Sequence, residues 1–275
     1  MKTQKIGFIG GGNMATSLIS GLLAAGHAPE QIWVSDINQD QLKTLTERLK
    51  VNVTSSNETV VNESDVVVLA VKPQTLRAVA QQVAQAIQQR KSLVVSIAAG
   101  ISERSLSAWL GADTPIVRCM PNTPALVLTG ATALHANEKV SPGQRSMAEN
   151  ILRSVGIALW VKEEKELDVV TAVSGSGPAY FFLLMEAMEK AALDMGLTEE
   201  TSRLLVLQTA LGAAKIALES SESPELLRKR VTSPGGTTQR AIDTFEQGGF
   251  KELVSKALHA ARDRSIEMSN QPEFN

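Results

Sequence analysis

The chain has 275 residues, which favours two domains over one and leaves room for a large buried core. Its apolar fraction of 43% and its charged fraction of 20% are typical of soluble globular proteins. The formal net charge of −2 excludes a basic surface field that would attract nucleic acid or anionic lipid.

The single cysteine, Cys119, excludes an intrachain disulfide framework and a multi-cysteine metal site, and it fits a reducing compartment. The apolar run Ile6–Ile9 is too short for a signal peptide. We expect no membrane span either, because no stretch approaches the roughly 20 apolar residues that a bilayer requires. The sequence therefore predicts a cytoplasmic protein without a metal centre, which binds neither nucleic acid nor membrane.

The first half of the chain alternates strand-like and helix-like segments. Short runs rich in Val and Ile are typical of buried parallel strands, and amphipathic segments lie between them. The expected strands are Lys5–Ile9, Gln31–Ser35, Asp65–Ala70, Ser92–Ile97, Ile116–Met120, Thr132–His135 and Ile157–Val161, and the expected helices are Asn13–Ala25, Gln39–Leu49 and Leu76–Gln89. This alternation predicts an α/β domain with a doubly wound parallel sheet of the Rossmann type.

After about Glu164, apolar residues recur at helical spacing and β-rich runs nearly disappear. The expected helices are Lys165–Val173, Ala179–Met195, Glu199–Glu219, Glu225–Val231, Thr237–Glu246 and Phe250–Asn270. The apolar surface of the segments Ala179–Met195 and Leu204–Leu218 exceeds what one thin domain can bury, which favours a dimer. We therefore expect an α/β domain over residues 1–162 and an all-α domain over residues 163–275.

A glycine-rich turn follows the first strand. Gly10, Gly12 and Ala15 fill the G-x-G-x-x-G/A positions of a dinucleotide-binding turn. Gly10 permits the tight turn, Gly12 lets the backbone approach a pyrophosphate, and Ala15 allows close packing of the helix. The pyrophosphate would lie at the helix N-terminus, beside Asn13 and Met14. A turn without a ligand is the alternative, but the preceding hydrophobic strand favours a nicotinamide dinucleotide.

The choice of cofactor depends on the end of the second strand. Ser35 and Asp36 lie about twenty residues past the turn, where an acid that binds ribose is expected. A carboxylate there favours NAD and repels the 2′-phosphate of NADP. Ser35, Asn38 and Lys43 could hold that phosphate if the carboxylate turned away, so NADPH and NADH both stay open. The remaining alternative is that Asp36 is an ordinary turn residue.

Two further strand ends lie where open α/β sheets bind ligands. Small residues there leave room for a nicotinamide ring or a ribose, and Lys72 precedes a helix that starts with proline. A surface charge is the alternative for Lys72. The segments are Ala70, Val71, Lys72 and Pro73 after one strand, and Ala98, Ala99 and Gly100 after the next.

Six segments together resemble the pyrroline-5-carboxylate reductase family over essentially the whole chain. The last of them, VTSPGGTT, is the family's most specific signature, and with RCMPNTP at residues 118–124 it argues against a chance match. The segments are Ile6–Ala15, Ala70–Pro73, Ser96–Gly100, Arg118–Pro124, Ser174–Tyr180 and Val231–Thr238.

The resemblance implies reduction of the C=N bond of 1-pyrroline-5-carboxylate to L-proline by NADPH or NADH, the last step of proline biosynthesis. It also implies a helical domain that binds substrate and interleaves with a partner as a homodimer, and dimers that sometimes assemble into decamers. Asn57 matches a family position near the adenosine end of the cofactor. Members commonly prefer NADPH, and many also accept NADH. In this chain Asp36 stands near the position of the 2′-phosphate, which argues against a strong preference for NADPH.

By the same resemblance, Thr238 is the catalytic residue and hydrogen-bonds the imine nitrogen. Gly236 and Thr237 would offer backbone N–H groups to the substrate carboxylate, and Ser233 would add a hydroxyl donor. Glycine-rich helix starts bind anions without a charged side chain, which agrees with these roles. An ordinary N-cap at Thr237 or Thr238 is the alternative.

Two other segments are expected near the reacting groups. Asn122 could orient the nicotinamide carboxamide, the alternative being a turn built on two prolines. Ser174–Gly177 should cap a helix that starts at Pro178 and should face the nicotinamide or the substrate, with Ser176 as a substrate-binding residue. A role in helix packing alone is the alternative. No histidine lies in any of these motifs, so catalysis would depend on orientation and electrostatics.

Two rival functions share parts of this pattern. A dehydrogenase of the 3-hydroxyacid type has the same architecture but relies on a lysine motif in its helical domain, and neither Lys190 nor Lys215 lies in such a motif. A non-catalytic regulator that binds a dinucleotide would need the Gly10–Ala15 turn but not the Ser233–Thr238 segment.

Overall fold

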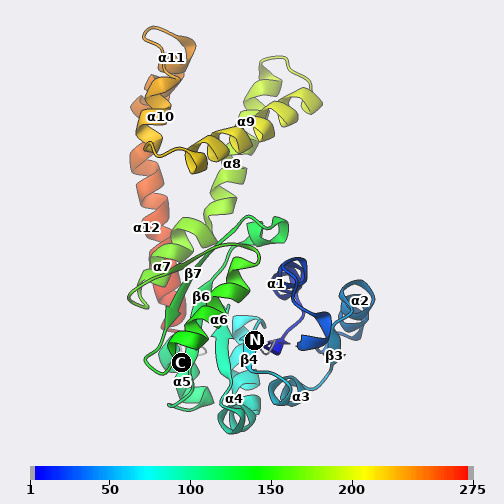
Figure 1. Cartoon of the computed structure of the whole chain (residues 1–275). Coiled ribbons are helices and arrows are strands. Elements are labelled where there is room, and N and C mark those ends of the chain that lie inside the picture. Colours follow the sequence, from blue (N-terminus) through cyan, green and yellow to red (C-terminus); the bar gives the residue numbers. More distant parts are fainter. Residues whose placement is uncertain (1–3, 272–275) are drawn as a thin grey trace. The chain divides into compact units, whose positions relative to one another are not determined.

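The alternating first part of the chain forms one twisted sheet in the computed structural model, which describes residues 4–271 (Figure 1). The strand order is β3-β2-β1-β4-β5-β6-β7-β8, and neighbours are parallel except for the antiparallel pair β6 and β7. The strands are β1 Ile6–Ile9, β2 Ile32–Ser35, β3 Asn52–Thr54, β4 Val66–Leu69, β5 Leu93–Ser96, β6 Ile116–Met120, β7 Gly130–Ala136 and β8 Gly156–Trp160. The predicted doubly wound sheet is confirmed, with β7 and β8 running against the other strands.

The central strands are buried on both faces, as their runs of apolar residues predict. Side chains alternate between two apolar clusters: Phe8 and Val68 belong to one, and Ile9 and Val67 belong to the other. Helices cover both faces and supply the rest of each cluster. The sheet is therefore a rigid platform whose strand ends hold their loops in fixed positions.

Several elements of this unit were not predicted from the sequence. They are the short strand β3 and the helices α3, α5 and α6, and α4 begins at Pro73 and not at Leu76. The N-terminus of α6 carries a complete capping box, in which Ser141 and Gln144 bond each other's backbone N–H groups. The helices are α1 Asn13–Ala24, α2 Gln39–Leu49, α3 Asn57–Asn62, α4 Pro73–Arg90, α5 Glu103–Leu110, α6 Pro142–Arg153 and α7 Glu166–Val170.

The expected helix break at Ser174–Gly177 is wrong. A π-helical turn, η3 (Thr171–Gly175), follows α7, and α8 (Gly177–Asp194) begins directly after it. Ser176 N–H donates to the Thr171 carbonyl at 2.8 Å, and the Ser174 hydroxyl bonds back to Val170, so neither serine caps a helix. The wider π turn takes the place of the loop that Gly and Pro residues indicated.

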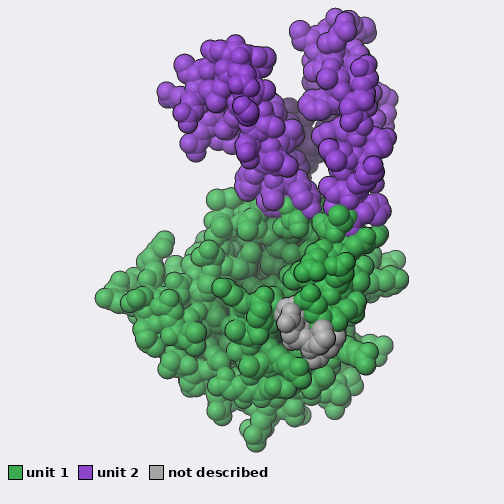
Figure 2. Space-filling model, turned by 180° about the vertical axis from the view of Figure 1, so that it is seen from behind, with its two compact units in different colours: residues 1–176, 260–275 green, residues 177–259 purple. Residues whose placement is uncertain are grey.

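The chain divides into two compact units (Figure 2). One comprises residues up to Ser176 together with residues from Ala260 onward, and the other is Gly177–His259. The end of the chain belongs to the first unit because the Ser265 hydroxyl donates to Asp168 at 2.7 Å and Met268 packs beside Gly100. The expected boundary between functional domains, at residues 162/163, stays a prediction. The two compact units instead separate at residues 176/177 and again at 259/260.

The second unit is a set of helices with very little interior. Gly177, Ser202 and Val206 are its buried residues, while many of its large apolar side chains are exposed. Helices α8 and α9 pack against each other. The helices are α8, α9 Glu199–Glu219, α10 Pro224–Arg230, α11 Thr237–Gln247 and the first part of α12 Phe250–Ser269.

The helical stretch Glu166–Asp194 is long and apolar enough, by length and composition, to cross a membrane. This corrects the expectation that no segment of the chain meets that criterion. Its most apolar window is only 17% buried within the described chain. An apolar helix of this kind also fits an interface with another protein chain.

Candidate active site

The Gly10–Ala15 turn lies between the carboxyl ends of β2 and β4. Gly10 N–H donates to the Ser35 carbonyl at 2.8 Å, and Ala70 N–H donates to the Ile9 carbonyl at 2.8 Å. Gly10 has a φ of +100°, and a side chain there would place its Cβ 2.7 Å from the Ala70 carbonyl oxygen. Only glycine fits this position, as the sequence pattern predicts.

The N-terminus of α1 is open. Gly12 is its N-cap, no side chain caps it, and a Cβ at Gly12 would meet no atom within 4 Å. Asn13 is exposed beside it, whereas Ala15 is 1% exposed and packs into the core. Unpaired N–H groups and the positive end of the helix dipole therefore face free space, an arrangement suited to a pyrophosphate.

Asp36 lies next to this turn and is held in place by two backbone groups. Its Oδ2 accepts a hydrogen bond from Gly11 N–H at 2.7 Å, and its Oδ1 accepts one from Asn38 N–H at 2.9 Å. Gln41, from α2, also donates to the Gly11 carbonyl. The carboxylate is thus one residue away from the open helix end, where the adenosine ribose of a dinucleotide is expected.

Ser35 and Asn57 bond to each other in the structure. The Ser35 hydroxyl, which is fully buried, donates to Asn57 Oδ1 at 2.7 Å. Asn57 Nδ2 in turn donates to Gln82 Oε1 at 3.0 Å. These bonds tie β2 to α3 and α4 below the expected adenosine position. Direct contact of either side chain with a cofactor stays a prediction.

The two other strand-end segments lie on the same edge of the sheet. Because β4 pairs with β1 and β5 pairs with β4, their carboxyl ends follow the glycine turn in order. Lys72 is exposed at the N-cap of α4, with Pro73 at the first helical position. The structure therefore brings together, along one edge, the predicted cofactor residues from Gly10 to Asp36, from Ala70 to Pro73 and from Ala98 to Gly100.

Asn122 follows β6 and is 9% exposed. Its Oδ1 accepts from Ala131 N–H at 2.9 Å, and its Nδ2 donates to the Ser174 carbonyl at 3.1 Å. Pro178 has no N–H, so the Ser174 carbonyl has no partner four residues later in the helix. Asn122 supplies that missing donor. Its observed role is to support the π turn, and contact with the nicotinamide stays a prediction.

The Ser233–Thr238 segment lies in the second unit and also leads into a helix with an open end. Gly236 is the N-cap of α11 and no side chain caps it, so the alternative of a threonine N-cap is wrong. Gly235 has a φ of +71°, and Gly236 N–H donates to the Ser233 carbonyl at 3.0 Å. Ser233 and Thr237 are exposed, and Thr238 is partly buried.

A charged cluster that the sequence analysis missed lies beneath β6 and β7. Arg118 bonds Glu164, which also accepts from Glu103 N–H, and His135 Nδ1 lies 3.7 Å from Glu103 Oε2. Burial raises the pKa of the Glu103 carboxyl, helped by the nearby charge of Glu164, and burial lowers the pKa of His135. Arg118 stands in the RCMPNTP motif, but the sequence does not indicate its ion pair, because Glu164 is 46 residues away.

Two further observations limit the chemistry. Burial raises the pKa of the Cys119 thiol, so it is not a thiolate nucleophile near neutral pH. Within residues 4–271, no three His, Cys, Asp or Glu side chains are grouped in a way that could hold a metal ion.

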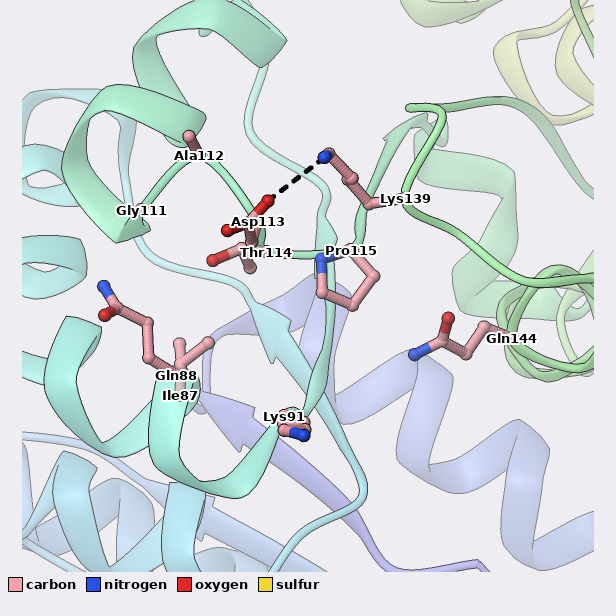
Figure 3. A pocket seen from close by; sticks show the side chains of 10 residues that line it. All are labelled: Ile87, Gln88, Lys91, Gly111, Ala112, Asp113, Thr114, Pro115, Lys139 and Gln144. Atoms are coloured by element: carbon pink, nitrogen blue, oxygen red, sulfur yellow. Dashed lines mark hydrogen bonds and ion pairs between the residues drawn. The ribbon is translucent and has the colours of Figure 1, made fainter.

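A cavity of about 430 Å³ lies at the opposite edge of the sheet (Figure 3). It is near the start of β5 and β6, since Lys91 and Pro115 line it, and Lys139 pairs there with Asp113 at 3.1 Å. Its position at the amino ends of the strands separates it from the edge where dinucleotides bind.

Comparison with known proteins identifies the family. A pyrroline-5-carboxylate reductase from Pseudomonas aeruginosa is 53% identical over 271 residues, which are 98% of this chain and 99% of that protein. The chain belongs to the pyrroline-5-carboxylate reductase family. The family model for pyrroline-5-carboxylate reductase dimerisation matches residues 164–268, and a model described as NADP oxidoreductase coenzyme F420-dependent matches residues 5–100.

Solved structures of this reductase family agree with the fold. A pyrroline-5-carboxylate reductase from Coxiella burnetii superposes with a TM-score of 0.94 at 46% identity. The superposition covers 98% of this chain and 100% of that chain. A pyrroline carboxylate reductase from Plasmodium falciparum, solved with NADP bound, gives a TM-score of 0.87 at 32% identity, covering 98% and 100% of the two chains. The family predicted from the six motifs is therefore confirmed.

Proposed function

We propose that this chain reduces the C=N bond of 1-pyrroline-5-carboxylate to L-proline with NADPH or NADH, as the last step of proline biosynthesis. The observation that carries this function is the match to a curated reductase of that name over nearly the full length of both chains. The open helix end at Gly12, beside a sheet edge lined with small residues, supports the cofactor part of the proposal.

The first unit holds the dinucleotide. The pyrophosphate lies on the N–H groups at the start of α1, beside Asn13 and Met14, and the adenosine ribose lies beside Asp36. The nicotinamide end lies beside Ala99, which is partly exposed between the buried Ala98 and Gly100, and near Lys72 and Pro73. When bound, the reduced nicotinamide supplies the hydride that reaches the imine carbon.

The second unit supplies the substrate carboxylate site. The open N-terminus of α11 offers the backbone N–H groups of Gly236 and Thr237, and the exposed Ser233 adds a hydroxyl donor. Thr238 hydrogen-bonds the ring nitrogen and holds the imine in one orientation. Ser176, which follows the π turn in the first unit, is the remaining residue that we assign to substrate binding.

This division of roles needs no strong acid. A protonated iminium is already electrophilic, so orientation and electrostatics can lower much of the barrier. The nitrogen carries its proton into the product as the imine carbon gains the hydride. The residues of the Ser233–Thr238 segment fit such a role because they position the substrate through hydrogen bonds and carry no charge.

The reaction is tested by mixing the enzyme with pyrroline-5-carboxylate and each reduced dinucleotide and following loss of the reduced nicotinamide. Turnover with proline as product is expected. Turnover only with 3-hydroxyacids, or binding of dinucleotide without turnover, would favour the dehydrogenase or the regulator instead.

Self-association follows from the dimerisation family model at residues 164–268. We propose a homodimer in the cytoplasm, formed through the exposed apolar faces of α8 and α9, with decamers built from dimers. Phe181, Phe182 and Leu204 are among the exposed side chains that this contact would cover. Mass measurement by light scattering should give a dimer or a multiple of one. A monomer at micromolar concentration would contradict the proposal.

A further inference from the structure

We propose that this chain prefers NADH to NADPH and that Asp36 determines the preference. The inference rests on the proposed function only in its first part, that a nicotinamide dinucleotide binds along the Gly10–Ala15 turn. It goes further because it assigns one side chain to the discrimination between the 2′-hydroxyl of NADH and the 2′-phosphate of NADPH.

The Asp36 carboxylate is fixed in the orientation that suits a ribose. Gly11 N–H bonds one oxygen at 2.7 Å and Asn38 N–H bonds the other at 2.9 Å. A carboxylate has about four lone-pair positions, so acceptor capacity remains on both oxygens. Two vicinal hydroxyl groups can donate to that remaining capacity. The bonds to the backbone also oppose a rotation that would move the charge away from an incoming phosphate.

Two of the residues that could hold a 2′-phosphate, Ser35 and Asn38, are occupied elsewhere. The buried Ser35 hydroxyl donates to Asn57, and Asn38 Oδ1 caps α2 by accepting from Asp40 and Gln41 N–H at 3.0 and 3.2 Å. The exposed Lys43 lies 4.0 Å from Glu47 on the same helix. The N-terminus of α2 therefore cannot offer these N–H groups to a phosphate, because they already donate to the Asn38 side chain.

The local charge has the wrong sign for a phosphate. Asp36 directly follows β2, and Asp40 lies in the first turn of α2. Within residues 4–271, no lysine or arginine forms an ion pair with either carboxylate. Ile37, the residue directly after Asp36, is 96% exposed and carries no charge. A dianionic phosphate here would meet two carboxylates that no ion pair neutralises.

The test measures dissociation constants of NADH and NADPH by nucleotide fluorescence, together with kcat/KM for each. The unaltered enzyme should bind NADH roughly ten- to hundredfold more tightly. Asp36→Ser should lower that ratio by roughly a hundredfold or reverse it. Asp36→Asn keeps an oxygen that can accept from Gly11 and should lower the ratio by roughly tenfold. Glu30→Gln removes one exposed negative charge just before β2, at the opposite end of that strand from Asp36, and should leave the ratio unchanged.

Each outcome decides the matter. Tighter binding of NADPH by the unaltered enzyme, or an unchanged ratio in Asp36→Asn, would overturn the proposal. If Asp36→Ser loses its fold, as judged by circular dichroism, the Asp36→Asn ratio decides. Failure of the proposed function is separate, since it would appear as absent turnover of the imine while the NADH preference in binding persists.

Discussion

The two glycine-rich turns of this chain share a local design and differ in their surroundings. Gly10–Ala15 and Ser233–Thr238 each lead into a helix whose N-cap is a glycine without a capping side chain. The first is bonded to two strands and to Asp36, and its unit has a large apolar core. The second lies mostly exposed in a unit with almost no interior.

This difference separates a site that its own chain preorganises from one that depends on other groups. Around Gly10, backbone bonds and close packing fix the position of each N–H group before a ligand arrives. Around Gly236, the internal bond to Ser233 shapes the turn, but few neighbours hold it. Variants of both turns can test whether backbone N–H groups bind a ligand equally well when many neighbours hold the turn and when few do.

The largest expected effect is on the first turn. Gly12→Val should weaken cofactor binding by roughly a hundredfold or more, because the side chain would fill the space over the start of α1. The fold should persist, since a Cβ at Gly12 meets no atom within 4 Å. Dinucleotide titration and thermal melting check both statements. Gly143→Val is the matched control, because Gly143 is equally open near the start of α6. Unchanged affinity in Gly12→Val would refute the cofactor site.

Thr238→Ala probes the second turn. It should lower kcat/KM for the imine by roughly ten- to hundredfold through loss of a hydrogen bond to a charged group. Dinucleotide affinity should stay the same. The neighbouring Thr237→Ala should have little effect, because Thr237 is assigned a backbone role. Equal losses in the two variants would argue that helix stability, and not the imine bond, is responsible.

Alanine at Gly10 and at Gly235 compares the support of the two turns directly. Both glycines have positive φ, but a Cβ meets the Ala70 carbonyl at Gly10 and open space at Gly235. Gly10→Ala should therefore cost about 1–2 kcal/mol more in free energy of unfolding than Gly235→Ala. All three tryptophans, Trp33, Trp109 and Trp160, lie in the first unit, so their fluorescence during urea unfolding reports the Gly10 effect. Equal costs would mean that the turns are equally supported.

The smallest expected effect concerns the charged cluster that supports the first unit. Burial lowers the pKa of His135 below its ordinary value of 6.5, so the unfolded chain binds more protons below that pH. Stability should therefore fall as pH drops below about 6.5. His27 acts in the same direction, and Glu103, whose pKa is raised, acts oppositely at lower pH.

His135→Gln should reduce this loss, by less than about 3 °C in Tm between pH 7.5 and 6, because solvent screens a partly exposed group. Glu164, Arg118, Arg145 and Glu166 also influence His135 and remain in the variant. Melting curves across that range measure the change. A steeper loss in the variant would contradict the assigned sign.

Much of the fold was readable from the sequence, because buried strands such as Val66–Leu69 are continuous apolar runs. The missed elements carried weaker signals. β3 is three residues long, and α6 was overlooked although Ser141 and Gln144 form a recognisable capping box. The π turn was missed because Gly175, Gly177 and Pro178 usually indicate a loop, and the compensating Asn122 is far away in sequence.

The site was readable to different degrees at its two turns. The Gly10 turn follows from local rules, since its pattern needs one strand, three small residues and a helix. The role of Ser233–Thr238 came from family resemblance, because exposed threonines before a helix have several ordinary uses. The engagement of Ser35 and Asn38 could not be foreseen, because it depends on which neighbours fold against them.

The scarcity of buried residues in the second unit has a consequence for how the chain folds. Three buried positions within residues 177–259 cannot offset the conformational entropy of ordering so many residues. The helices after Gly177 must therefore gain much of their stability when another chain covers them. Refolding should show a fast phase, reported by the tryptophans of the first unit, and a later gain of helix whose rate rises with protein concentration. If the covering chain is a second copy, as proposed, the rate at which a newly synthesised chain completes its fold depends on the concentration of that chain.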